Sequence, residues 1–218
     1  MFASQTLKGL LVLCLAGTLL VSCGKDTDEK TADAILTANQ LLSRDQCDEA
    51  ISILEGVGRK SDNVLYLITL SSAYACRAGY SEITLFEKDV SKIGTPSELG
   101  GMARFSTSDD LTAMSDTEYA DMKTAIEILL FLGEGDDGTN PTVGDRTQEL
   151  GDIQAGDLHA TLMYEIMVQL GRFLSLYGNV DTNGNKGAGS GTNQCIIDYQ
   201  DDLTIDAVVL IVQAADHG

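Results

Sequence analysis

Basic residues and histidine are scarce in this chain. Its 218 residues contain 14 Lys and Arg against 33 Asp and Glu, a formal charge of −19, and only two His. Nucleic-acid binding needs clustered Lys and Arg side chains that contact phosphates, and no basic run occurs here. The scarcity argues against a nucleic-acid partner. The simplest interpretation of the acidic excess is a solvated surface. If the surface does bind a partner, a cation or a basic partner would suit this charge better than an acidic partner.

The motifs of common catalytic and zinc sites are also missing. The chain has no Gly-x-Ser-x-Gly, no His-Glu-x-x-His and no phosphate-binding loop. It has no Cys-x-x-Cys, and no His stands at ligand spacing from a Cys, which argues against zinc. His159 lies beside the apolar face of a predicted helix, where a single His packs or faces solvent more often than it catalyses. Nothing in the sequence therefore predicts an enzyme, and a hydrolase ranks third among the possible functions.

Helical periodicity is what the sequence does contain. Apolar residues make up 44% of the chain, which is ordinary for a globular protein with one core. Apolar positions three and four residues apart predict helices, and no segment alternates as a strand would. The fold class is therefore all-α. The predicted helices cover 31–42, 47–57, 63–78, 81–93, 119–130, 158–177 and 203–215, with the fifth capped by Asp116 and the sixth capped by Asp157.

The N-terminus carries a short apolar run that stops at a cysteine. Lys8 precedes apolar residues 9–21, a run too short to span a bilayer, and the run ends Leu20-Val21-Ser22-Cys23. This ending resembles the signal of bacterial lipoproteins, in which an aliphatic and two small residues precede the cysteine. The resemblance implies cleavage before Cys23, palmitate-type acylation of Cys23 and membrane attachment through the lipid.

The same resemblance implies a location and a division of the chain. Because Gly24 rather than Asp follows the cysteine, it implies sorting to the outer membrane, facing the periplasm. Residues 1–22 would be the signal peptide, and 23–30 the acylated cysteine and a polar tether. Residues 31–218 would form one all-α periplasmic domain.

The first predicted helices follow a recognisable spacing. The stretch ANQLLSRDQCDEAISILEGV resembles a tetratricopeptide repeat (TPR), with small residues at Ala38 and Ala50 and a large one at Leu54. It departs from that pattern at Ala34, where an aromatic residue is usual, and at Asp62, where Pro is usual. The resemblance implies a stack of helical hairpins whose concave surface holds partner segments. It therefore implies a membrane-anchored protein-interaction scaffold, with a protein partner that the sequence does not identify.

The five cysteines separate by location. Cys14 falls in the signal and Cys23 would carry the lipid, so Cys47, Cys76 and Cys195 remain in an oxidising compartment. In a stack of antiparallel helices, the start of one helix lies beside the end of the next. That arrangement predicts a Cys47–Cys76 disulfide. Pairing of either cysteine with Cys195 stays open.

A loop rich in Gly and Asn, 178–194, offers the one candidate cation site of note. Asp181, Asn183 and Asn185 place oxygen donors at alternate positions, as the start of a calcium-binding EF-hand loop does. The match fails at Lys186, where Gly is needed, and at Thr192, where Glu is needed. An ordinary loop is the simpler interpretation, and a protein that binds Ca²⁺ or a small ligand through this loop is the alternative function. Other oxygen donors are Asp198 and Asp201, and a weaker candidate site comprises Asp136, Asp137 and Asn140.

Overall fold

The computed structural model describes residues 27–92, 105, 116–133 and 141–178 of the chain. These residues form helices, and no strand occurs among them, which confirms the all-α fold class. The α-helices are α2 (Thr27–Leu42), α3 (Cys47–Gly56), α4 (Val64–Arg77), α5 (Glu82–Thr84), α7 (Thr117–Leu130), α8 (Val143–Leu150) and α9 (Asp152–Gly178). A π-helical turn, η1 (Leu85–Asp89), and a 3₁₀ turn, η2 (Val90–Lys92), continue α5.

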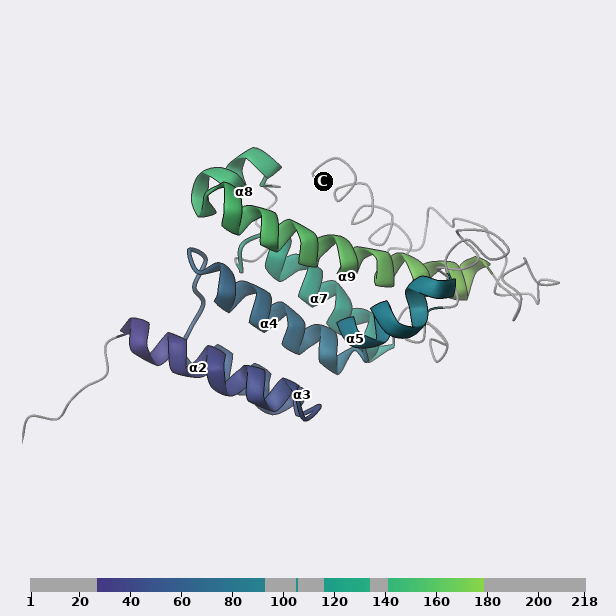
Figure 1. Ribbon diagram of the computed structural model, residues 1–218, viewed down its shortest axis with the longest axis horizontal. Helices are drawn as coiled ribbons and strands as arrows, with labels where there is room; N and C mark the ends of the chain where they lie inside the picture. The colour runs from purple at the N-terminus through teal and green to yellow at the C-terminus, as the bar shows by residue number, and fades with distance from the viewer. Residues whose placement is uncertain (1–26, 93–104, 106–115, 134–140, 179–218) are drawn as a thin grey trace, which may run out of the picture.

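Helix α4 lies at the centre of the arrangement (Figure 1). It packs against α2 and α3 on one side and against α7 and α9 on the other, while α8 packs against α9. Buried apolar side chains from Ala34 in α2 to Val168 in α9 belong to one hydrophobic cluster. The described helices therefore share a single core.

The sequence of α4 explains its central position. Asn63 caps the helix, because its side chain accepts a hydrogen bond from the Tyr66 backbone N–H at 3.0 Å. A helix that is apolar on most faces has to be covered on most faces. The Tyr66 hydroxyl also satisfies its hydrogen bond inside the core by donating to the Leu54 carbonyl of α3 at 3.2 Å. The buried residues of α4 are Val64, Tyr66, Leu67, Thr69, Leu70, Ser71, Ala73 and Ala75.

The first hairpin, α2 and α3, contains the two alanines that the repeat-like spacing singles out. Ala38 and Ala50 are both fully buried, as is Leu54. Small buried side chains let two helix backbones approach closely, and α2 and α3 do contact each other. The burial that the spacing implies is therefore found, while membership of the repeat family stays a prediction.

Helix α2 begins four residues earlier than the apolar pattern predicts. Residues 27–30 are the exposed first turn of this helix, so the helix overlaps the end of the segment 23–30 for which the sequence suggests a tether. Asp28 and Glu29 lie in that first turn, where the positive end of the helix dipole stabilises carboxylates. An apolar pattern cannot predict this first turn, because the turn contains no buried apolar side chain.

Helix α8 lies where the apolar pattern predicts no helix, and α9 begins before the predicted start at Asp157. Thr142 and Asp145 form a capping box that starts α8: the Thr142 hydroxyl accepts from the Asp145 N–H, and the Asp145 carboxylate accepts from the Thr142 N–H. Gly151, with φ of +81°, turns the chain from α8 into α9. Asp157 lies exposed inside α9 and does not cap it. Capping boxes usually carry Glu or Gln at this position, so a pattern that ends in Asp does not predict this one.

Candidate functional site

The predicted disulfide joins Cys47 and Cys76. Cys47 is the first residue of α3 and Cys76 the next to last of α4, and their Cα atoms lie 5.7 Å apart. The two helices meet start to end, as the antiparallel arrangement requires. A crosslink over a separation of 29 residues stabilises the folded chain by about 3.5 kcal/mol, mainly by restricting the unfolded state.

A hollow of about 230 Å³ lies beside this disulfide. It is formed by the turn after α2, the second half of α4 and the start of α5. Its volume is below the roughly 300–1,000 Å³ of sites that enclose drug-sized ligands, so it fits one side chain better than a cofactor. The lining contains two carboxylates, both on exposed residues, and neither Lys nor Arg. The lining residues are Leu42, Asp45, Ser72, Cys76, Tyr80, Ser81, Glu82 and Ile83.

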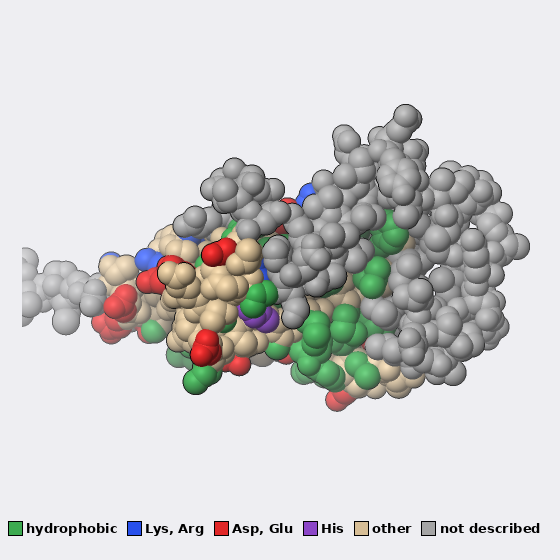
Figure 2. Space-filling view, turned by 90° about the horizontal axis from the view of Figure 1, so that it is seen from above, with side chains coloured by type: hydrophobic (Ala, Val, Ile, Leu, Met, Phe, Trp, Pro, Cys, Tyr) green, Lys and Arg blue, Asp and Glu red, His purple; other side chains and the backbone are tan. Residues whose placement is uncertain are grey.

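An exposed apolar ridge continues from the hollow. We define it as the exposed Ile83, Phe86 and Val90 together with the half-buried Tyr164. The first three are 69%, 54% and 41% exposed and stand three and four residues apart, as on one helical face. The Phe86 ring packs edge to face on Tyr164 of α9, with centroids 5.1 Å apart. Figure 2 shows hydrophobic side chains gathered on the face of the molecule seen from above. Such gathered apolar exposure is typical of an interaction surface.

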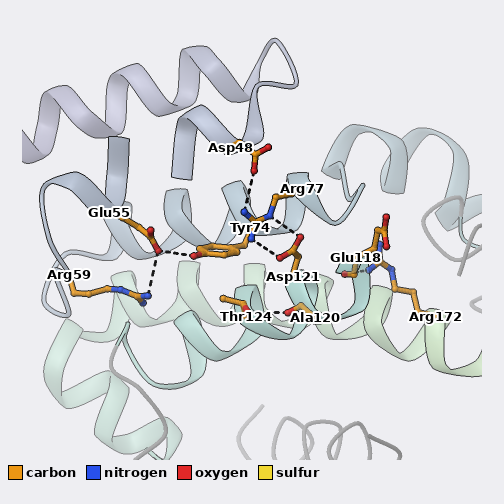
Figure 3. A network of polar contacts seen from close by, with 10 residues as sticks. All are labelled: Asp48, Glu55, Arg59, Tyr74, Arg77, Glu118, Ala120, Asp121, Thr124 and Arg172. Carbon is orange, nitrogen blue, oxygen red and sulfur yellow. Dashed lines mark hydrogen bonds and ion pairs between the residues drawn. The ribbon is translucent and has the colours of Figure 1, made fainter. Parts of the chain in front are cut away.

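A network of charged and aromatic side chains ties α3, α4 and α7 together (Figure 3). Arg77 donates through Nε and Nη2 to the two oxygens of Asp121, at 2.8 and 2.7 Å, and through Nη1 to Asp48 at 3.2 Å. The Tyr74 hydroxyl donates to Glu55 at 2.7 Å, and the Arg77 guanidinium lies over the Tyr74 ring. Burial raises the pKa of Tyr74 to about 12, and the hydrogen bond to Glu55 adds to this. These groups satisfy one another, so the network holds helices in place.

Helix α9 buries a row of polar side chains. Glu165, Gln169 and Arg172 stand four and three residues apart, on one face, and are almost completely buried. The row continues the face of Leu162, which is also buried. The apolar pattern instead places Met163 on the buried face, which is wrong, because Met163 is 52% exposed. The polar row has the same helical spacing as an apolar stripe, but hydrophobicity alone cannot reveal it.

Glu165 lies in the core with no exposed surface, and burial favours the neutral form of its carboxyl. The Ser71 hydroxyl lies 2.6 Å from Glu165 Oε1 and 2.9 Å from the Ala125 carbonyl oxygen. A hydroxyl has one proton and can donate to only one of these acceptors. A protonated Glu165 resolves the conflict by donating to Ser71, which then donates to Ala125. Burial raises the pKa of Glu165 to about 8 and Glu82 adds a smaller increase, whereas a Ser71 hydroxyl that donated to the carboxylate would lower this pKa.

The other two residues of the row, Gln169 and Arg172, donate hydrogen bonds to backbone carbonyls at helix ends. Arg172 donates to the carbonyl of Ala78, at the C-terminal end of α4, and to the carbonyl of Glu118 in the first turn of α7. A cation is favoured at a helix C-terminus. Burial lowers the pKa of Arg172 to about 10, which still leaves it charged at neutral pH. Gln169 donates to the Tyr119 carbonyl at 3.4 Å. The row is closed to solvent, so it supports the fold and cannot act on a dissolved substrate.

His159 is occupied by a neighbouring cation. The Arg146 Nε donates to His159 Nε2 at 2.9 Å, and Arg146 also donates to the carbonyls of Pro141 and Leu130. Burial lowers the pKa of His159, and the charge of Arg146 lowers it further. The imidazole therefore accepts a hydrogen bond in its neutral form. This contact assigns His159 a structural role, as its place beside an apolar face predicts.

Several predicted residues lie outside the part of the chain that the structure describes. They are Cys23, Cys195, the loop donors Asp181, Asn183 and Asn185, and the weaker group Asp136, Asp137 and Asn140. Within the described ranges, no group of three His, Cys, Asp or Glu side chains is placed to hold a metal ion. Among the described helices, none is long and apolar enough to cross a bilayer.

Comparisons with known families, with curated proteins and with solved structures give no significant match. The functional inference therefore rests on the residues and their geometry.

Proposed function

We propose that this chain is a lipid-anchored, outer-membrane protein whose helical domain binds a protein partner on its periplasmic side. The sequence Leu20-Val21-Ser22-Cys23 supports the anchor, since it matches the lipoprotein signal at all four positions. Two or more acyl chains give lasting attachment, whereas a single chain would be marginal.

The exposed apolar ridge is the observation that carries the binding role. Isolated exposed apolar side chains are common, but Phe86 and Tyr164 come from separate elements and pack against each other at the surface. The ionisable side chains of the described core are buried or paired with one another, which favours binding over catalysis. A helical-hairpin stack that presents such a surface is typical of a scaffold.

The binding role is tested by recovering partners from detergent-solubilised membranes with the full-length protein. Phe86→Ser removes the centre of the ridge, and the recovered partner should fall at least fivefold, because contact anchors of this kind contribute about 1 kcal/mol or more. Leu65→Ser is the matched control, since Leu65 is a similarly exposed apolar residue of α4 outside the ridge. Equal recovery with both variants would contradict the proposal.

The anchor is tested separately by fractionation. Cys23→Ser removes the only thiol that the lipoprotein signal would acylate, so the protein should move from the membrane pellet to the soluble fraction. A variant that stays in the pellet after a high-salt wash would contradict lipid anchoring.

A further inference from the structure

The hollow beside the disulfide combines apolar walls with a negative rim. Leu42 and Ile83 contribute aliphatic surface, and carboxylates come from Asp45 in the turn after α2 and from Glu82 at the start of α5. Cys76 fixes the position of the hollow, because its disulfide to Cys47 holds the end of α4 against the start of α3. This region therefore presents a preformed shape.

The volume and chemistry of the hollow match one long basic side chain. A Lys or Arg side chain has an aliphatic stem that packs on apolar surface and a charged end that stays near solvent. The apolar walls would contact the stem, and the two rim carboxylates would contact the charged end. An acidic side chain would be repelled there, since the lining carries no Lys or Arg. The excess of 33 acidic over 14 basic residues in the whole chain attracts the same kind of partner over longer distances.

The hollow and the apolar ridge share Ile83 and therefore form one continuous surface. We propose that this surface docks a protein segment that inserts a Lys or Arg side chain into the hollow and lays its apolar residues along the ridge. The inference rests on the proposed partner-binding function and adds the chemistry of the partner: an amphipathic, basic segment.

Three labelled twelve-residue peptides test this chemistry by fluorescence anisotropy with the full-length protein. Each has the same leucine-rich apolar face, and the polar positions are all Lys, all Gln or all Glu. The Lys peptide should bind at least tenfold more tightly than the Glu peptide and about three- to tenfold more tightly than the Gln peptide. These ratios correspond to two partly exposed ion pairs of modest strength.

Variants of the protein test whether the preference for the Lys peptide comes from the hollow. The double variant Asp45→Asn and Glu82→Gln should reduce the preference for Lys over Gln to less than about twofold, because the two ion pairs that it removes account for the expected ratio. Asn suits position 45, where the backbone is left-handed with φ of +56°. The double variant Glu49→Gln and Glu149→Gln makes the same change of net charge at exposed sites outside the hollow and should keep the preference.

The remaining outcomes overturn the inference. An equal loss of preference in the control double variant would mean that net charge alone attracts the peptide. Equal affinity for Lys and Gln peptides, or no binding at millimolar protein, would reject the basic segment. If recovery of a membrane partner still depends on Phe86 in either case, the scaffold function stands and only the partner chemistry fails.

Discussion

The buried carboxyl of Glu165 makes the stability of this fold depend on pH. Its pKa is raised by burial to about 8, from 4.5 for an ordinary Glu. The folded state therefore holds a proton between pH 4.5 and 8 that the unfolded state releases. The contribution of Glu165 to stability is fully present below pH 4.5, falls by about 1.4 kcal/mol for each pH unit up to 8, and is constant above that.

The change Glu165→Gln removes this dependence. The difference between the two pKa values corresponds to about 5 kcal/mol in total, and to about 3 kcal/mol by pH 7. Gln keeps a donor for Ser71 but leaves a buried amide, so the net gain at pH 7 should be about 2 kcal/mol. That is a large change for a protein whose stability is on the order of 5–15 kcal/mol.

The assay is urea unfolding of the full-length protein, followed by circular dichroism at several values between pH 5 and 9. The Glu165→Gln protein should lose less stability than the parent as pH rises from 5 to 8, whereas Glu49→Gln, at an exposed site on α3, should follow the parent curve. If the two variants showed the same pH dependence, the neutral state of Glu165 in the folded protein would be refuted.

Three further changes test the packing of the same helices, each by the midpoint of urea unfolding. Replacing Cys47 and Cys76 by Ala should lower the free energy of unfolding by about 3.5 kcal/mol, and no loss would argue against the disulfide. Asp121→Asn disrupts an ion pair whose carboxylate is only 8% exposed and should cost about 1–2 kcal/mol, whereas Asp48→Asn, at a carboxylate 77% exposed, should cost less than about 0.5 kcal/mol. Ala50→Leu adds volume where no space remains and should cost about 1–3 kcal/mol; an unchanged midpoint would mean that α3 packs loosely.

Helices with an apolar stripe could be predicted from the sequence because that stripe is a local property of the chain. The pattern Tyr119, Met122, Ile126, Leu129 and Leu130 predicts the buried face of α7, and all five side chains are buried. Helix α8 lacks such a stripe and begins with a capping box, so periodicity did not find it. The start of α9 was missed for a related reason, since its first turn is exposed.

The disulfide could be predicted from local pattern together with one general rule of helix packing. Its prediction needed only the positions of Cys47 and Cys76 at opposite ends of consecutive helices and the rule that neighbouring helices run antiparallel. The hollow beside it could not be predicted, because its walls come from three segments whose separation in space depends on how the turns close.

The sequence by itself determined the all-α class, the main helical stripes and the acidic surface, because composition and short-range spacing decide these properties. Only the tertiary structure decided which polar side chains are buried. Ser71 and Glu165 are 94 residues apart in sequence, and neither neighbourhood indicates that they meet in the core. Glu165 and Met163 lie in the same helix, α9. Because α4 and α7 pack against only one face of that helix, Glu165 is buried and Met163 is exposed. Whether a polar or charged side chain is buried depends on the neighbours that folding brings together. The local periodicity of the sequence carries no information about those neighbours.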